Sequence, residues 1–99
     1  MRAAVAIALV ATAACRGPWL PVATEADAAR AQLGLADLNH GRKLLIRHCS
    51  GCHLTPSPRD QEAAAWPSEV ADMQERSGLE PAEAALITQY LVAFATAPR

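Results

Sequence analysis

Two cysteines and a histidine near the middle of the chain have side chains and a spacing that could do chemistry. Cys49, Cys52 and His53 form the pattern Cys-x-x-Cys-His, which is the attachment signature of a c-type haem. Two thiols at this spacing lie on one face of a short turn and can form thioethers with the two vinyl groups of the porphyrin. The histidine that follows then lies under the ring, where it binds iron as the proximal ligand. The spacing therefore predicts one covalent haem c on Cys49 and Cys52, with His53 as an axial ligand.

Two other chemistries use paired cysteines, and the surrounding sequence favours neither. A redox dithiol of the thioredoxin type requires a βαβ context, but no stretch of alternating β-branched residues predicts a strand. A zinc site requires two further ligands at suitable spacing. His40 and His48 both precede the motif on one expected helix, and no second cysteine pair is present.

The first residues have the features of an export signal. Arg2 supplies a positive charge, residues 3–11 are uncharged and mostly apolar, and small residues lead to Cys15. An apolar run of about 14 residues is too short to span a bilayer. We therefore expect residues 1–14 to be a signal peptide and the chain to be periplasmic.

Cys15 has two interpretations. Ala13-Ala14-Cys15 resembles a bacterial lipobox, in which the cysteine becomes the lipidated first residue, although Thr12 replaces the usual leucine. Alternatively, ordinary signal peptidase cuts after either alanine and leaves a free thiol. Because the other two cysteines are assigned to haem, an odd thiol in an oxidising compartment would need another partner. Cysteine parity thus favours a lipid anchor in the membrane.

Length and composition predict a single small helical domain. The chain has 99 residues, of which 52% are hydrophobic and only 4% aromatic, and alanine, its main apolar residue, is the best helix former. A domain of this size buries a marginal core unless a cofactor, metal or disulfide supports it. The net charge of −1 and the lack of a basic cluster argue against nucleic acid as a partner.

The expected elements lead up to the cysteine motif. Residues 15–36 form a tether or linker, which holds a proline-rich extended stretch and a short helix with Thr24 as N-cap. Residues 37–99 form the haem domain. Its first helix begins at Asp37 as N-cap and runs into Cys49, and Gly41 within it marks the close approach of the C-terminal helix.

Helical patterns continue after the motif. Asp60 is the expected N-cap of a helix over residues 60–76, in which Pro67 produces a kink or starts a second helix. Trp66, Val70 and Met73 fall at i, i+4 and i+7 and share one face, which we expect to look at the haem.

The last helix has clear boundary signals. Gly78 ends the helix before it, and Pro81 begins a helix that extends to about Ala95. Leu86, Tyr90 and Phe94 align along this last helix.

From residue 37 to about residue 95 the pattern resembles the small monohaem class I cytochromes c. The resemblance rests on a helix that carries Gly41, the motif at 49–53, the face of Trp66, Val70 and Met73, and a closing helix with Tyr90. It implies an all-α, cytochrome c-like fold whose N- and C-terminal helices cross near Gly41 and Tyr90 around the covalent haem. In this family the sixth iron ligand is usually a methionine, and Met73 is the only methionine outside the signal segment. The chain departs from the family in one respect: the loop from His53 to Trp66 is short, and many members place the ligand methionine in a longer loop nearer the C-terminal helix, whereas Met73 would act from a helix.

Other roles stay open for several of these residues. Met73 can instead be a core methionine, and His40 is the competing sixth ligand, which would lower the potential relative to His/Met ligation. Trp66 is expected to pack on haem with its indole N–H near a propionate. His48 is expected to face solvent or a propionate, and three arginines are solvated or pair with a propionate: Arg47, Arg59 and Arg76.

The resemblance implies a function in electron transfer and not catalysis. We expect a periplasmic carrier of single electrons, whose partners are a dehydrogenase or reductase and another cytochrome or an oxidase. The alternatives are a haem enzyme or gas sensor with an open sixth site, and an obligate cytochrome subunit of a larger dehydrogenase.

Overall fold

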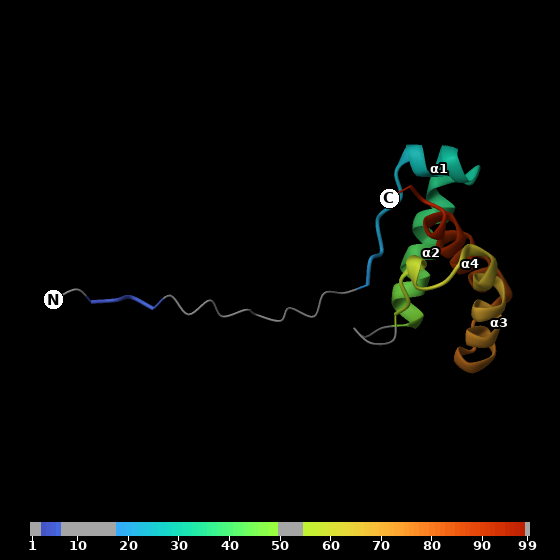
Figure 1. The fold of residues 1–99 in the computed structure, drawn as a ribbon. Helices are drawn as coiled ribbons and strands as arrows, with labels where there is room; N and C mark the ends of the chain where they lie inside the picture. Colours follow the sequence, from blue (N-terminus) through green and yellow to red (C-terminus); the bar gives the residue numbers. More distant parts are fainter. Residues whose placement is uncertain (1–2, 7–17, 50–54, 99) are drawn as a thin grey trace.

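In the described ranges, which are residues 3–6, 18–49 and 55–98, the computed structural model contains helices and no strand (Figure 1). The elements are α1 (Glu25–Ala31), α2 (Leu35–His48), the 3-10 turns η1 (Pro58–Asp60) and η2 (Ala63–Ala65), α3 (Trp66–Ser77) and α4 (Pro81–Ala95). The prediction of an all-α domain is thus confirmed for this part of the chain. None of the helices found there is both long and apolar enough to span a bilayer.

Several helix ends lie where local sequence signals predict them. Thr24 is the N-cap of α1, where its hydroxyl accepts from the Asp27 N–H and the Asp27 carboxylate accepts from the Thr24 N–H. Such a capping box satisfies N–H groups that the first turn leaves unpaired. Gly78 ends α3 in the left-handed conformation at φ 66°, and Pro81 opens α4.

Two expected N-caps are wrong. Helix α2 begins at Leu35 with Gly34 as its N-cap, so Asp37 lies inside the first turn. A carboxylate there is still stabilised by the positive end of the helix dipole. Asp60 does not begin a helix over 60–76. It closes η1, because its side chain bonds back to the Ser57 N–H at 2.9 Å. Since α3 starts at Trp66 with Pro67 in its first turn, the proline marks a helix start and not a kink.

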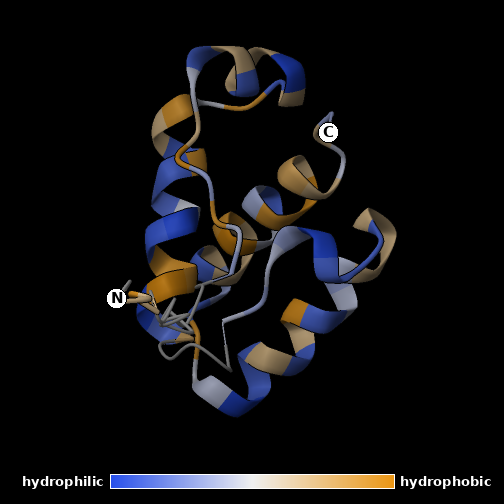
Figure 2. Cartoon of the chain, turned by 60° about the vertical axis from the view of Figure 1, so that its left-hand side comes forward, coloured by the Kyte–Doolittle hydropathy of each residue, from blue (hydrophilic) through white to orange (hydrophobic). Residues whose placement is uncertain are grey.

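Helix α4 forms the centre of the domain, and both α2 and α3 pack against it. Figure 2 shows α4 as the most apolar helix, while α2 and α3 alternate polar and apolar residues. Its buried side chains are Ala84, Ile87, Tyr90, Leu91, Ala93 and Phe94. Burial of this apolar surface supplies the main driving force for the fold.

The crossing of α2 and α4 depends on Gly41. A Cβ built on Gly41 would lie 2.8 Å from the carbonyl carbon of Leu86 and 3.1 Å from the Tyr90 Cβ. The two helix backbones therefore meet where no side chain fits between them. The prediction that Gly41 marks a close approach to the C-terminal helix is confirmed.

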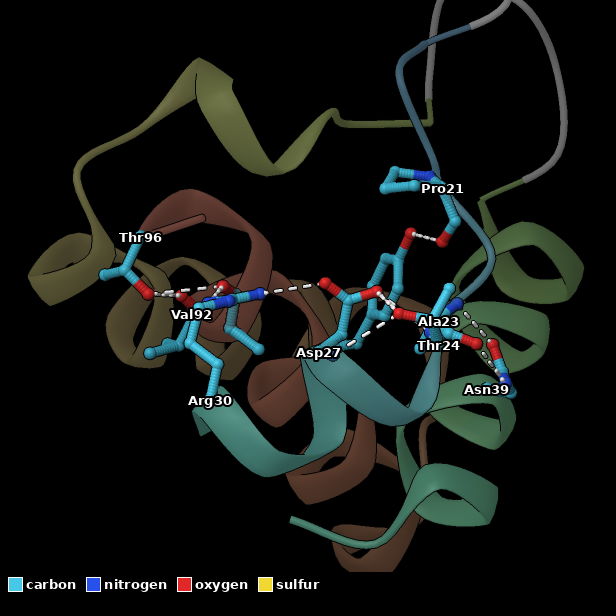
Figure 3. Close-up of polar contacts among 10 residues, drawn as sticks. Pro21, Ala23, Thr24, Asp27, Arg30, Asn39, Val92 and Thr96 are labelled. Atoms are coloured by element: carbon cyan, nitrogen blue, oxygen red, sulfur yellow. Dashed lines mark hydrogen bonds and ion pairs between the residues drawn. The ribbon is translucent and has the colours of Figure 1, made fainter. Parts of the chain in front are cut away.

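Residues 18–23, which we call the strap, lie along the helices and bond to them. The Tyr90 hydroxyl donates to the Pro21 carbonyl at 2.7 Å, and Arg42 Nε donates to the Leu20 carbonyl at 2.8 Å. The amide of Asn39 pairs with both backbone groups of Ala23, at 2.8 and 3.2 Å. Figure 3 shows Pro21 and the Ala23–Asn39 pair beside α1. The described part of the tether region is thus in contact with the residues that follow it.

Candidate functional site

Cys49 is the C-cap of α2 and the first residue of the motif. Its N–H donates to the Leu45 carbonyl at 3.0 Å, and its side chain is half-buried against the hydrophobic core. This burial raises the pKa of the Cys49 thiol above its ordinary value, because a thiolate loses its hydration there. The thiol is therefore held neutral at the edge of the core.

Thr55, two residues after the motif, contacts the first residue of the motif. Its hydroxyl donates to the Cys49 carbonyl. Cys52 and His53 lie outside the described residues, and their assignment to haem attachment and iron ligation stays a prediction. Cys15 also lies outside them.

Met73 is on α3, on the face that the sequence pattern predicts. Trp66 and Val70 are 2% and 1% exposed, and Met73 is partly buried against the same core cluster. The three residues therefore share one face, as expected from their i, i+4, i+7 spacing. The Met73 carbonyl accepts a hydrogen bond from the Ser77 hydroxyl near the end of α3. Iron ligation by Met73 stays a prediction.

The indole of Trp66 is a structural anchor. Its N–H donates to the Pro58 carbonyl at 2.9 Å, and both residues are buried. The expectation that this N–H reaches a propionate is therefore replaced by an internal hydrogen bond. It fixes the start of α3 against η1, a contact that the helical spacing of Trp66 does not reveal.

His48, the last residue of α2, pairs with the first turn of α4. Its Nε2 lies 3.2 Å from the Glu83 carboxylate, and both side chains are about a quarter exposed. The hydrogen bond with His48 lowers the pKa of Glu83, and the Glu80 N–H contributes in the same direction. Glu83 was not recognised from the sequence as a partner of His48, because only the α2–α4 packing brings them together.

The remaining candidate residues are exposed on the surface of the domain. His40 is exposed on α2, and Arg47 and Arg76 are exposed as well. The guanidinium of Arg59 lies 3.7 Å from the ring centroid of Trp19, a cation–π geometry. In the portion that the structure describes, no three His, Cys, Asp or Glu side chains are grouped to hold a metal ion.

A hollow of about 450 Å³ lies between α1 and α4. Its walls are Arg30, Ala31, Leu33, Thr88, Gln89, Val92, Ala93 and Thr96. Neither Cys49 nor Met73 borders it, so it does not belong to the candidate site. Arg30 of α1 reaches α4, where its guanidinium donates to the Ala93 carbonyl at 2.9 Å.

The described donors fit a haem in their chemistry. A thiol at the end of α2 and a thioether on α3 both lie against the apolar core around α4, and thioether sulfur is an established axial ligand of cytochrome haem iron. Comparisons with protein-family models, curated proteins and solved structures found no match to this chain.

Proposed function

We propose that this chain is an exported c-type cytochrome that carries single electrons between periplasmic redox proteins. The observation that carries the proposal is the motif of Cys49, Cys52 and His53, which starts at the residue where α2 ends against the core. A haem c bound there would supply reversible Fe(II)/Fe(III) cycling.

The crossing of α2 and α4 supports a cytochrome c-like fold as part of this proposal. The resemblance implies that the N- and C-terminal helices of the domain cross near Gly41 and Tyr90. In the structure Gly41 faces Leu86 and Tyr90 of α4 without room for a side chain. This agreement concerns a long-range contact, whereas the motif concerns neighbouring residues, so the two arguments are independent.

The chain's own residues would set the properties of the carrier. Cys49 and Cys52 would hold the cofactor covalently, and His53 would orient it from the proximal side. Met73 would supply a neutral sulfur from α3 as the sixth ligand, and His/Met ligation raises the potential relative to bis-His ligation. Trp66 and Val70 beside it are buried, and such an apolar wall excludes water and lowers the local dielectric.

Covalent haem attachment is tested by producing the full chain with its export signal in a host that matures cytochromes c. We expect the band on a denaturing gel to stain for haem, and the pyridine haemochrome spectrum to be that of two thioether bonds. Cys49→Ala or Cys52→Ala should each shift that spectrum or abolish attachment, whereas Cys15→Ser should retain it. Wild-type protein without covalent haem, recovered from the periplasm, would reject the proposal.

Electron carriage is tested on the haem-loaded protein. Low-spin ferric haem with a sulfur-to-iron charge-transfer band, and reversible one-electron voltammetry, are the expected results. A high-spin ferric spectrum with ready binding of CO or peroxide would favour the enzyme or gas-sensor alternative. Stable co-purification with a larger dehydrogenase would favour the obligate subunit.

The proposal includes acylation of Cys15. The acyl chains would hold the carrier at the periplasmic face of a membrane, where its redox partners are a dehydrogenase or reductase and an oxidase or another cytochrome. Loss of membrane association in Cys15→Ser, with haem content unchanged, tests this part by itself.

A further inference from the structure

We propose that the strap and Arg59 form a corner of the domain that rests on phospholipid headgroups and fixes the orientation of the protein on the membrane. This inference rests on the acylation of Cys15 in the proposed function, but it does not depend on the haem. Three observations carry it: the length of chain between Cys15 and the strap, the bonds that hold the strap, and the side chains that it exposes.

The chain between the acylation point and the domain is very short. Only three peptide steps separate Cys15 from Pro18, so Pro18 lies within about 11 Å of the Cys15 Cα even at full extension. The polar layer on each side of a bilayer is roughly 5–8 Å thick. A cysteine acylated at the membrane surface therefore keeps the start of the strap in or against the headgroup layer.

The strap cannot rotate independently of the domain, because its residues are hydrogen-bonded to the rest of the fold. Tyr90 of α4 donates to the Pro21 carbonyl at 2.7 Å, and Arg42 of α2 donates to the Leu20 carbonyl at 2.8 Å. The Trp19 carbonyl accepts from the Ser57 hydroxyl at 3.2 Å. These bonds begin at Trp19, the second residue of the strap, so the strap from there onward is fixed to the helices.

The exposed side chains of the strap suit a lipid interface. Trp19 is 38% exposed and Val22 is 61% exposed, and they make up half of the large hydrophobic side chains that the described part of the chain exposes. The rings of Trp19 and Phe94 also form a T-shaped pair, with centroids 5.9 Å apart. Tryptophan is enriched at membrane–water interfaces, where one side of its ring is apolar and its N–H is polar.

Arg59 completes the corner with a positive charge. Its exposed guanidinium lies over the Trp19 ring at 3.7 Å, and an arginine can cover apolar surface with its stem while its head reaches phosphate oxygens. A tryptophan beside an arginine is thus placed at the end of the domain nearest the acyl chains. This proximity favours lipid as the occupant over a protein partner or a second copy of the chain.

Photo-crosslinking in the cell envelope tests the orientation on the full-length acylated protein. A benzophenone amino acid is placed at Trp19, at Val22 or at Glu75. Glu75 is exposed on α3, which Figure 1 shows on the far side of α2 and α4 from the strap. We expect several-fold more phospholipid adduct from positions 19 and 22 than from position 75. Circular dichroism of each purified variant checks that the domain is folded, independently of the haem.

Weakening the strap should remove this difference. The double variant Tyr90→Phe, Arg42→Gln deletes the hydrogen bonds to Pro21 and Leu20, so we expect the lipid adducts from the three positions to become similar. If they are already similar in the parent protein, the domain pivots freely and the inference is overturned.

Two further outcomes would overturn it in other ways. Adducts at positions 19 and 22 with a protein and not with lipid would assign the corner to a partner or a second copy. An unmodified Cys15, read from the mass of the mature N-terminal peptide, would remove the anchor. Neither result would affect haem attachment and redox activity, which test the proposed function separately.

Discussion

Gly41 of α2 lies directly against the carbonyl group of Leu86 in α4. A Cβ at position 41 would be 2.8 Å from the carbonyl carbon of Leu86 and 3.1 Å from the Tyr90 Cβ, and Gly41 itself is buried. The backbone atoms of a helix cannot move aside for an added methyl group, whereas the end of a flexible side chain can. The position therefore excludes every residue with a side chain unless the helices separate.

Gly41→Ala should destabilise the protein even though alanine is the better helix former. Forcing a methyl group into this contact costs about 1–3 kcal/mol or more, and the gain in helix propensity returns only about 1 kcal/mol. Urea unfolding of the purified protein measures the difference. Gly34→Ala is the matched control, because a Cβ there meets only the Asp37 carboxyl group at 3.5 Å or more. Equal stabilities for both variants would contradict the close packing of α2 on α4.

Trp66→Phe should reduce stability by leaving the buried Pro58 carbonyl without its donor. An unsatisfied buried acceptor costs about 1–3 kcal/mol, and the smaller ring adds a packing loss. The control is Trp19→Phe, since the Trp19 backbone carbonyl, and not its ring, accepts the hydrogen bond from the Ser57 hydroxyl, and Trp19 is 38% exposed. Thermal unfolding followed by circular dichroism should show the larger decrease in Tm for the Trp66 variant.

Tyr90 should make the protein sensitive to alkaline pH. Burial raises the pKa of Tyr90 well above its ordinary value of 10.0, so near that pH the unfolded chain releases the phenolic proton more readily than the folded chain does. The stability that comes from this group is complete below pH 10 and decreases as the pH rises above it. Tyr90→Phe should flatten this alkaline decrease.

At neutral pH Tyr90→Phe also loses the hydrogen bond to the Pro21 carbonyl. We expect a decrease of about 0.5–1.5 kcal/mol in the free energy of unfolding at pH 7. Unfolding curves of both proteins at pH 7 and above pH 10 provide the comparison. Because Tyr90 is the only tyrosine, an alkaline decrease of the same size in the variant would show that other groups cause it.

Met73→Leu separates iron ligation from packing. Leucine conserves most of the volume, so its cost in stability should be below about 1.5 kcal/mol, but it lacks the sulfur. If Met73 is the distal ligand, the variant keeps covalent haem, loses the sulfur-to-iron charge-transfer band, binds CO and has a lower potential. An unchanged ferric spectrum would mean that Met73 is a core residue only, and His40→Ala would then test the competing ligand.

Local sequence signals predicted much of the secondary structure. The N-cap at Thr24, the stop at Gly78 and the start at Pro81 depend on groups within a few residues of each other, which a sequence displays directly. Asp37 and Asp60 were misplaced because an acidic residue suits the N-cap and the first turn alike. Choosing between those positions requires backbone angles, which residue types do not specify.

The candidate site divides in the same way. The chemistry proposed for Cys49, Cys52, His53 and Met73 rests on residue types, spacing and the family resemblance. The shared face of Trp66, Val70 and Met73 followed from the period of a helix. The pairing of His48 with Glu83 was not predicted, since those residues are 35 positions apart. Gly41 was the one long-range contact that the sequence predicted, because a glycine inside a helix indicates the close approach of another element even when that element is distant in sequence.

By itself the sequence determined the helical character, and it is the source of the proposed class of chemistry and the proposed export signal, since each depends on residue types within a short window. Only the tertiary structure decided where residues 18–23 lie, because their partners Arg42 and Tyr90 are 22 and 69 positions away. Proline-rich composition predicts an extended backbone but not whether it is free or docked. That outcome depends on carbonyl groups that meet donors on α2 and α4 only after these helices have packed together at Gly41.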